Sequence, residues 1–243
     1  MQAEEYARMY AYENHYWWFV GRRRLVGELI GAFVDLGTGW VLDAGCGTGA
    51  MLSELSRTAP AVGVDIEASA LHYARQRGDF PLIRARLEAL PFVNESFRLI
   101  VALDVLEHLP DEAHALAELW RVLEPDGWLI TTVPAYRWLW SKHDVALHHY
   151  RRYTACHLRE RLQSAGFTVC KLSYSVMFLF LPIALVRWWD RWHSAPPTAT
   201  LVPVAPWLNR WLTALQSLEA RLIRRGSLPW GVSLVAVARK NKV

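Results

Sequence analysis

A chain of 243 residues with 53% hydrophobic and 21% charged side chains can bury a sizeable core, which excludes an intrinsically disordered protein. Its three cysteines have neither C-x-x-C spacing nor an even count, so neither a disulfide framework nor a zinc cluster is expected. The net charge of +4 says little by itself, because the whole excess comes from a segment between Arg187 and Arg225 with six arginines and two acidic residues.

The N-terminal stretch is aromatic and basic. Residues 6–19 hold seven aromatic side chains, and three arginines follow. Tyr6, Tyr10 and Trp17 recur at helical spacing, so we expect residues 1–30 to form a leading helix that either packs on the core or covers a ligand site as a lid. This stretch has no apolar core of signal-peptide length, which predicts a cytoplasmic protein.

A glycine-rich turn follows the first predicted strand. In VLDAGCGTGA, residues 41–50, a short apolar strand leads into glycines at every second position, and Met51 begins a helix. Glycine lets the backbone approach a ligand closely, so the pattern predicts a nucleotide-binding turn. The spacing is G-x-G-x-G, whereas a dinucleotide fingerprint is G-x-G-x-x-G. The alternative is that the glycines serve an ordinary strand-to-helix turn.

Two further strands end in acidic residues. Residues 61–65 predict a buried strand that ends at Asp65, whose carboxylate would accept hydrogen bonds from ribose hydroxyls or cap the next helix. After a third short strand at residues 81–84, residues 97–103 predict a fourth, followed by Asp104 and His108. Ligands of open α/β sheets bind at the carboxyl ends of strands, so both residues are site candidates, against helix capping and simple packing as alternatives.

These motifs, together with the run L-x-E-L-x-R-V-L-x-P-x-G-x-L over residues 116–129 and the element D-V-L-E-H-L, resemble the class I S-adenosylmethionine-dependent methyltransferases from Val41 to Val133. The resemblance implies S-adenosylmethionine as cofactor and a doubly wound, seven-stranded, mainly parallel sheet. It implies that the methionine end of the cofactor is held by Asp43, Gly45, Gly47 and Gly49. It also implies that Asp65 binds the ribose, that Leu87 contacts the adenine and that Asp104 borders the methionine part. Arg86 departs from the aspartate that the family carries at the adenine.

The loop at residues 134–153 carries the acceptor-side candidates. It follows a strand end, where substrate-specific residues lie on such a scaffold, and it is dense in histidine, arginine and aromatic residues. We expect His108, His148 or His149 to act as a base and Tyr153 to position the acceptor. The histidines lack a helical metal-ligand pattern, so no metal is predicted.

The C-terminal part predicts an insertion before the last strand. A helix near residues 158–165 and a strand at 167–172 precede it, and the strand at 231–238 should pair antiparallel with the latter. The predicted divisions are a lid at 1–30, a cofactor-binding core at 31–174, a helical insertion at 175–229 and the last core strand at 230–243.

The insertion combines apolar, tryptophan and arginine residues. The run VMFLFLPIALV at residues 176–186 is too short to span a bilayer, and a helix at residues 208–222 places leucines on one face and arginines toward the other. Residues 176–225 therefore predict either a dimer interface or substrate roof, or peripheral docking on the inner face of the membrane. Sparse lysine argues against nucleic acid as a partner.

The sequence thus predicts methyl transfer to a small-molecule or lipid-linked acceptor, most favourably to an oxygen, because the N/D-P-P-Y motif of amino-group methylation is missing. Two other classes are retained. One is a catalytically silent cofactor-binding protein that acts as a partner or membrane adaptor. The other is a dinucleotide oxidoreductase, against which the glycine spacing argues.

Overall fold

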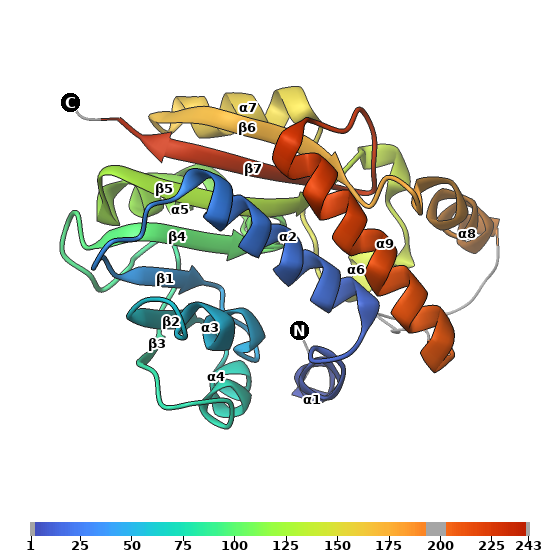
Figure 1. Ribbon diagram of the computed structural model, residues 1–243, viewed down its shortest axis with the longest axis horizontal. Helices are drawn as coiled ribbons and strands as arrows, with labels where there is room; N and C mark the ends of the chain where they lie inside the picture. The colour runs from blue at the N-terminus through green and yellow to red at the C-terminus, as the bar shows by residue number, and fades with distance from the viewer. Residues whose placement is uncertain (1–2, 193–202, 242–243) are drawn as a thin grey trace.

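The computed structural model describes residues 3–192 and 203–241, which form a seven-stranded sheet with helices on both faces (Figure 1). The strand order is β3-β2-β1-β4-β5-β7-β6. Strands β1 to β5 run parallel to one another, and β7 runs antiparallel to both β5 and β6. The strands are β1 Val41–Ala44, β2 Ala61–Asp65, β3 Leu82–Arg84, β4 Phe97–Leu103, β5 Leu123–Pro134, β6 Phe167–Ser175 and β7 Ser233–Lys240. The predicted fold class is confirmed.

Apolar faces of the helices explain the layers. In Figure 1, α2 and α9 cross one face of the sheet side by side, and α5 and α7 cover the other. On the first face Leu29 and Ile223 pack with the sheet in one core, and on the second Leu119 and Leu162 do so in another. The helices are α1 Ala3–Tyr12, α2 Trp17–Phe33, α3 Ala50–Leu55, α4 Ala68–Arg75, α5 Glu112–Val122, α6 Lys142–Ala146, α7 Ala155–Ser164, α8 Phe180–Trp192 and α9 Pro206–Arg225, with single turns η1 Leu106–His108 and η2 Arg137–Leu139.

The leading aromatic segment is two helices, not one. Helix α1 ends at Tyr12 and α2 begins at Trp17, with Tyr16 in an extended conformation between them. A tertiary contact stabilises the break between the two helices. The carboxylate of Glu13 accepts hydrogen bonds from the hydroxyl of Thr48 and, at 3.0 Å, from the guanidinium of Arg77. Asn14 and His15, both weak helix formers, accommodate the turn.

In the sequence, helices α8 and α9 come between β6 and β7, within the segment predicted as an insertion. The leucine face predicted for the second helix is only partly buried. Residues Trp211, Leu218 and Leu222 are exposed, whereas the buried face comprises Leu212, Gln216, Glu219, Ala220 and Ile223. The reason is the close contact with α2, where a Cβ added at Gly21 would lie 2.7 Å from Cβ of Gln216. Among the described residues no helix is long and apolar enough to cross a membrane.

Candidate active site

The carboxyl ends of the parallel strands open into one cavity of about 1140 Å³. In Figure 1 these ends point toward the side of the molecule that carries α6 and α8. The wall includes Asp43 in β1, Asp65 at the end of β2, Asp104 after β4 and Pro134 at the end of β5. Helix α1 with Tyr6 and Met9 closes the cavity over the glycine loop. The cavity therefore lies where the sheet topology places ligands in open α/β folds.

The glycine loop is shaped by its own backbone. Gly45 and Gly47 both have positive φ, 76° and 52°, which side chains rarely adopt. A Cβ at Gly47 would lie 2.6 Å from Cε of Met9. Gly45 and Gly47 line the cavity, and Gly49, with φ 83°, lies at the N-cap of α3 behind it. Two of the three predicted glycines therefore face the cavity, and the third joins the loop to the helix.

Asp65 organises this loop. Its Oδ2 accepts the amide of Gly47 at 2.9 Å, and its Oδ1 accepts the amide of Glu67, also at 2.9 Å. Burial raises the pKa of Asp65, although the two amides lower it in part. Each oxygen keeps a lone pair for a further donor, because a carboxylate offers about four acceptor positions. The alternative role of Asp65 as a helix cap is not seen, since Glu67 is the N-cap of α4 and has no side-chain capping bond.

Asp43 lies deeper. Burial, reinforced by Glu13, raises its pKa to about 7, and its Oδ2 has no hydrogen-bond partner among the described residues. A buried carboxylate oxygen without a partner is costly unless a donor arrives. Asp43 lines the cavity, so a bound ligand can supply that donor.

Arg86 and Leu87 after β3 also line the cavity. Leu87 is buried and lines the cavity, so it offers an apolar surface there. Arg86 also lines the cavity and its guanidinium pairs with Glu88 at 2.8 Å. The arginine therefore has an acidic partner at the edge of the cavity.

Asp104 is held by two partners. Its backbone has φ 53°, its Oδ1 accepts the hydroxyl of Thr132 at 2.9 Å, and its Oδ2 pairs with the guanidinium of Arg22. Arg22 comes from α2, so the aromatic segment contributes to the strand ends directly. Sequence analysis missed this pair, because nothing in the spacing of the arginines singles out Arg22.

His108, His148 and His149 lie on the same wall. The ring centroids of His108 and His149 are 4.6 Å apart and nearly perpendicular. Burial and His149 lower the pKa of His108 to about 4, so its imidazole is neutral at pH 7. His149 Nδ1 lies 2.9 Å from Oδ1 of the buried Asp144. The structure brings together the three predicted base candidates from two separate chain segments.

Tyr153 is placed elsewhere. It is 1% exposed, its hydroxyl donates to Glu112, and its ring stacks on His157. It does not belong to the cavity wall. The structure therefore places Tyr153, predicted to position an acceptor, in the core with its hydroxyl bonded to Glu112 rather than at the cavity.

Two wall residues carry chemistry that the sequence analysis did not assign. Glu107 is 1% exposed, and within residues 3–192 and 203–241 neither of its carboxylate oxygens has a hydrogen-bond partner in another residue. Burial, then Asp104, raises its pKa well above the ordinary value. Glu13 is the other, bonded to Thr48 and Arg77 beside the glycine loop. The E-H dipeptide was the available signal for Glu107.

Comparisons with known proteins agree with this geometry. A family model described as a methyltransferase domain matches residues 42–131. Trans-aconitate 2-methyltransferase of Deinococcus radiodurans is 30% identical over 193 residues, covering 75% of this chain and 71% of that protein. A probable S-adenosylmethionine-dependent methyltransferase of Mycolicibacterium smegmatis is 32% identical over 53% of this chain, which spans only 52% of that relative's length.

A lipid-directed relative and a solved structure also match. Phthiotriol/phenolphthiotriol dimycocerosates methyltransferase 1 of Mycobacterium ulcerans is 33% identical over 41% of this chain and 39% of its own length. The crystal structure of a methyltransferase from Thermotoga maritima superposes with a TM-score of 0.60 at 18% identity, covering 98% of this chain and 96% of that one. At that identity the superposition speaks for the fold alone.

Proposed function

The chain belongs to the class I S-adenosylmethionine-dependent methyltransferases, and we propose that it methylates a hydroxyl oxygen of an apolar or lipid-linked acceptor. The enzyme class and the cofactor follow from the family. The observation that carries the acceptor class is the shape of the cavity. One end is lined by the acidic strand ends and the glycine loop, and the other by apolar residues of the segment from α8 to α9, Leu179, Pro182, Ile183, Val186 and Leu212.

The cofactor occupies the polar end in this proposal. The backbone of Gly45 and Gly47 approaches its methionine part, with Gly49 setting the turn behind them. Asp43 receives a donor there, which removes the cost of its unpaired oxygen. The free lone pairs of Asp65 accept the ribose hydroxyls. Leu87 covers the adenine, and Asp104, fixed by Arg22, borders the sulfonium.

The acceptor hydroxyl lies at the histidine-bearing wall, between the cofactor and the apolar end. Its oxygen attacks the methyl carbon, the carbon–sulfur bond breaks, and the electron pair stays on sulfur as the neutral thioether S-adenosylhomocysteine. The hydroxyl proton passes to an imidazole. His149 is the best oriented of the three, because Asp144 holds its Nδ1 and leaves Nε2 to accept a proton. Positioning of the two reactants supplies most of the acceleration.

Calorimetry on the whole chain tests the donor half of the proposal. We expect saturable binding of S-adenosylmethionine and none of NAD. Asp65→Ala removes two charge-assisted bonds to the ribose, each worth about 1.5 kcal/mol or more, so the affinity should fall by about 100-fold or more. Asp79→Ala, at an exposed aspartate, is the matched control and should bind as the wild type does. Binding of NAD without S-adenosylmethionine would overturn the proposal.

Isotopic labelling tests the acceptor half. The enzyme is incubated with S-adenosylmethionine carrying a labelled methyl group and a membrane lipid extract. The proposal expects label in the organic phase that survives mild alkali, because methyl ethers resist the hydrolysis that removes methyl esters. Exclusive labelling of water-soluble compounds would exclude an apolar acceptor. Cofactor binding without any transfer would favour the silent cofactor-binding adaptor instead.

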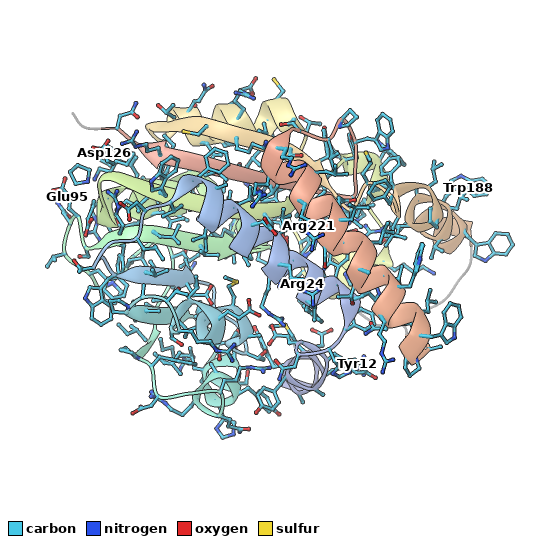
Figure 2. The ribbon with its side chains drawn as sticks, viewed as in Figure 1. Tyr12, Arg24, Glu95, Asp126, Trp188 and Arg221 are labelled. Carbon is cyan, nitrogen blue, oxygen red and sulfur yellow. The ribbon has the colours of Figure 1, made fainter. Side chains whose placement is uncertain are left out.

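The outer surface of α8 suggests how such an acceptor reaches the site. Ile183 faces the cavity, while Leu181 and Leu185 are 70% and 64% exposed. Figure 2 shows Trp188 on the same helix, directed away from the sheet at the edge of the molecule, and Arg221 on α9. Exposed apolar and tryptophan side chains beside arginines suit the boundary between headgroups and acyl chains. Docking there brings the apolar end of the cavity to a lipid surface.

Vesicle co-sedimentation tests this docking. We expect pelleting with vesicles that contain anionic lipid, and weaker pelleting for the double variant Leu181→Ser and Leu185→Ser, which removes apolar area but no charge. The control is Val93→Ser, at a residue 79% exposed beside Glu95, which Figure 2 places at the opposite end of the molecule. If neither neutral nor anionic vesicles pellet the wild type, the exposed face of α8 is a dimer contact or the outside of a roof.

A further inference from the structure

Three cavity-lining side chains, Glu107, His108 and His149, converge on one point. One ligand atom of each lies within 4.8 Å of the other two. Glu107 and His108 belong to η1 after β4, and His149 follows α6. Because these segments are far apart in the sequence, the cluster cannot be recognised from residue spacing within one helix.

The carboxylate of Glu107 points to a missing partner. It is 1% exposed, and neither oxygen bonds to another of the residues that the structure describes. Two basic side chains near Glu107 have other partners, since Arg22 pairs with Asp104 and Arg152 pairs with Asp144. A buried carboxylate is normally paired or bound to a metal ion. Glu107 therefore has the free acceptor oxygens that a cation requires.

Both histidines are oriented in the way that metal ligands are. His149 Nδ1 is engaged by Asp144, which leaves Nε2 for an ion. Asp144 is itself fixed by Arg152 at 2.8 Å and by the amide of Ser141 at 2.9 Å. The ring of His108 contacts the backbone carbonyl of Leu147, which leaves its second nitrogen free. Carboxylate and carbonyl partners of this kind fix the orientation of metal-binding imidazoles.

We propose that Glu107, His108 and His149 bind a divalent transition-metal ion of the Zn²⁺ type, with its remaining coordination positions open to the cavity. Two imidazole nitrogens and one carboxylate are a frequent ligand set for catalytic zinc and for other first-row divalent ions. Ligand atoms around tetrahedral zinc lie about 3.4 Å apart. The distances between the three ligand atoms, at most 4.8 Å, would have to shorten by roughly 1 Å to reach this spacing, and small side-chain rotations can supply that change.

The chemical role of the ion rests on the proposed function, although its binding does not. An acceptor hydroxyl on an open position loses its proton more easily, because the ion stabilises the resulting oxyanion. The proton passes to His148, the third imidazole on the wall, and the oxygen then attacks the methyl carbon as the carbon–sulfur bond breaks. His108 and His149 act as ligands in this refinement, and the ion replaces direct proton transfer to His149.

Metal titration of the full-length protein tests the site without any acceptor. The protein is stripped with a chelator, then titrated with Zn²⁺ by calorimetry and with Co²⁺ by visible absorption. We expect one high-affinity site per chain and the absorption bands of a tetrahedral or five-coordinate Co²⁺ ion. Glu107→Gln and His149→Gln, which keep the side-chain size, should each weaken the affinity by more than 100-fold. Asp144→Asn should weaken it by about 10- to 100-fold.

The matched control is His114→Gln, which changes an exposed histidine on α5 and should leave the titration unchanged. S-adenosylmethionine binding is measured on the same samples, so a variant that fails to fold is recognised by loss of both. If the wild type binds the cofactor but no Zn²⁺ or Co²⁺ at one saturable site, the metal site is refuted and the methyltransferase proposal stands. Binding that Glu107→Gln and His149→Gln leave as tight as in the wild type also refutes it.

Discussion

Replacing Asp144 by asparagine should destabilise the protein strongly, because this carboxylate fixes the loop between β5 and α7. It is fully buried and accepts from Arg152 and from the Ser141 amide, and Nδ1 of His149 lies 2.9 Å from it. The amide keeps the shape but leaves the guanidinium of Arg152, itself only 6% exposed, without a counter-charge. Breaking a buried ion pair on one side costs about 3–5 kcal/mol. For a chain of this size that is a fall in Tm of roughly 10 °C.

Thermal and urea unfolding followed by circular dichroism and tryptophan fluorescence measure this loss. Burial alone would raise the pKa of Asp144, but His149 and Arg152 hold it below the ordinary value. The stabilisation is therefore present above the unfolded pKa of about 3.9 and is lost as the pH falls below it, so the wild type and the variant should converge there. Asp79→Asn should stay within about 0.5 kcal/mol of the wild type. A loss below about 1 kcal/mol for Asp144→Asn at pH 7 refutes the reasoning.

Two further predictions concern the cofactor end. Burial raises the pKa of Asp43 to about 7, so the folded state binds more protons than the unfolded state between about pH 4 and pH 7. Stability of the cofactor-free protein should fall with rising pH across that window. Asp43→Asn should therefore stabilise the protein by up to about 4 kcal/mol at pH 8 but hardly at pH 4. Gly49→Ala should cost about 1–3 kcal/mol in urea unfolding, since φ is 83° and the new Cβ would lie 2.8 Å from Cβ of Ala74, whereas Gly27→Ala on α2, with open space around it, should stabilise by about 0.5–1 kcal/mol. Equal effects of the two glycine changes, or a pH-independent effect at Asp43, would contradict these assignments.

The sheet could be predicted because its strands have local sequence signals, such as runs of apolar residues. Phe97–Leu103 is an almost continuous apolar run, and the structure gives it the same bounds as the sequence does. Strand β5 begins at Leu123, ahead of the apolar run at residues 128–133, because Leu123 pairs with Phe97 and a register shift accommodates the turn residues near Asp126. The antiparallel pairing of the last two strands is confirmed. Strand identity is a short-range property, so composition and period suffice to find it.

The arrangement of Glu107 and the histidines that line the cavity could not be predicted in the same way. Its histidines were named from composition, but the contact of His149 with His108 and the burial of Glu107 depend on a loop that folds back over η1. That loop is held by the buried ion pair of Asp144 with Arg152, which has no periodic signature. Tyr153, equally plausible by position, is drawn into the core by the apolar surface of its ring. Long-range polar pairing decided these outcomes, and a single sequence does not encode it visibly.

Helix α9 is hydrogen-bonded to the chain segments at both ends of the cavity. The carboxylate of Glu219 on α9 accepts the amide of Met177 at 2.8 Å, which fixes the start of the segment that leads into α8 above the acceptor end. Asn209 on the same helix accepts the amide of Trp17 at 2.9 Å and donates to the carbonyl of His15 at 2.7 Å, where the chain turns from α1 into α2. A displacement of α9 must therefore shift the roof over the acceptor and the segment over the cofactor together. In the proposed function, entry of an apolar acceptor and closure over the cofactor would then be coupled through α9, because this helix contacts both the segment leading into α8 and the turn from α1 into α2.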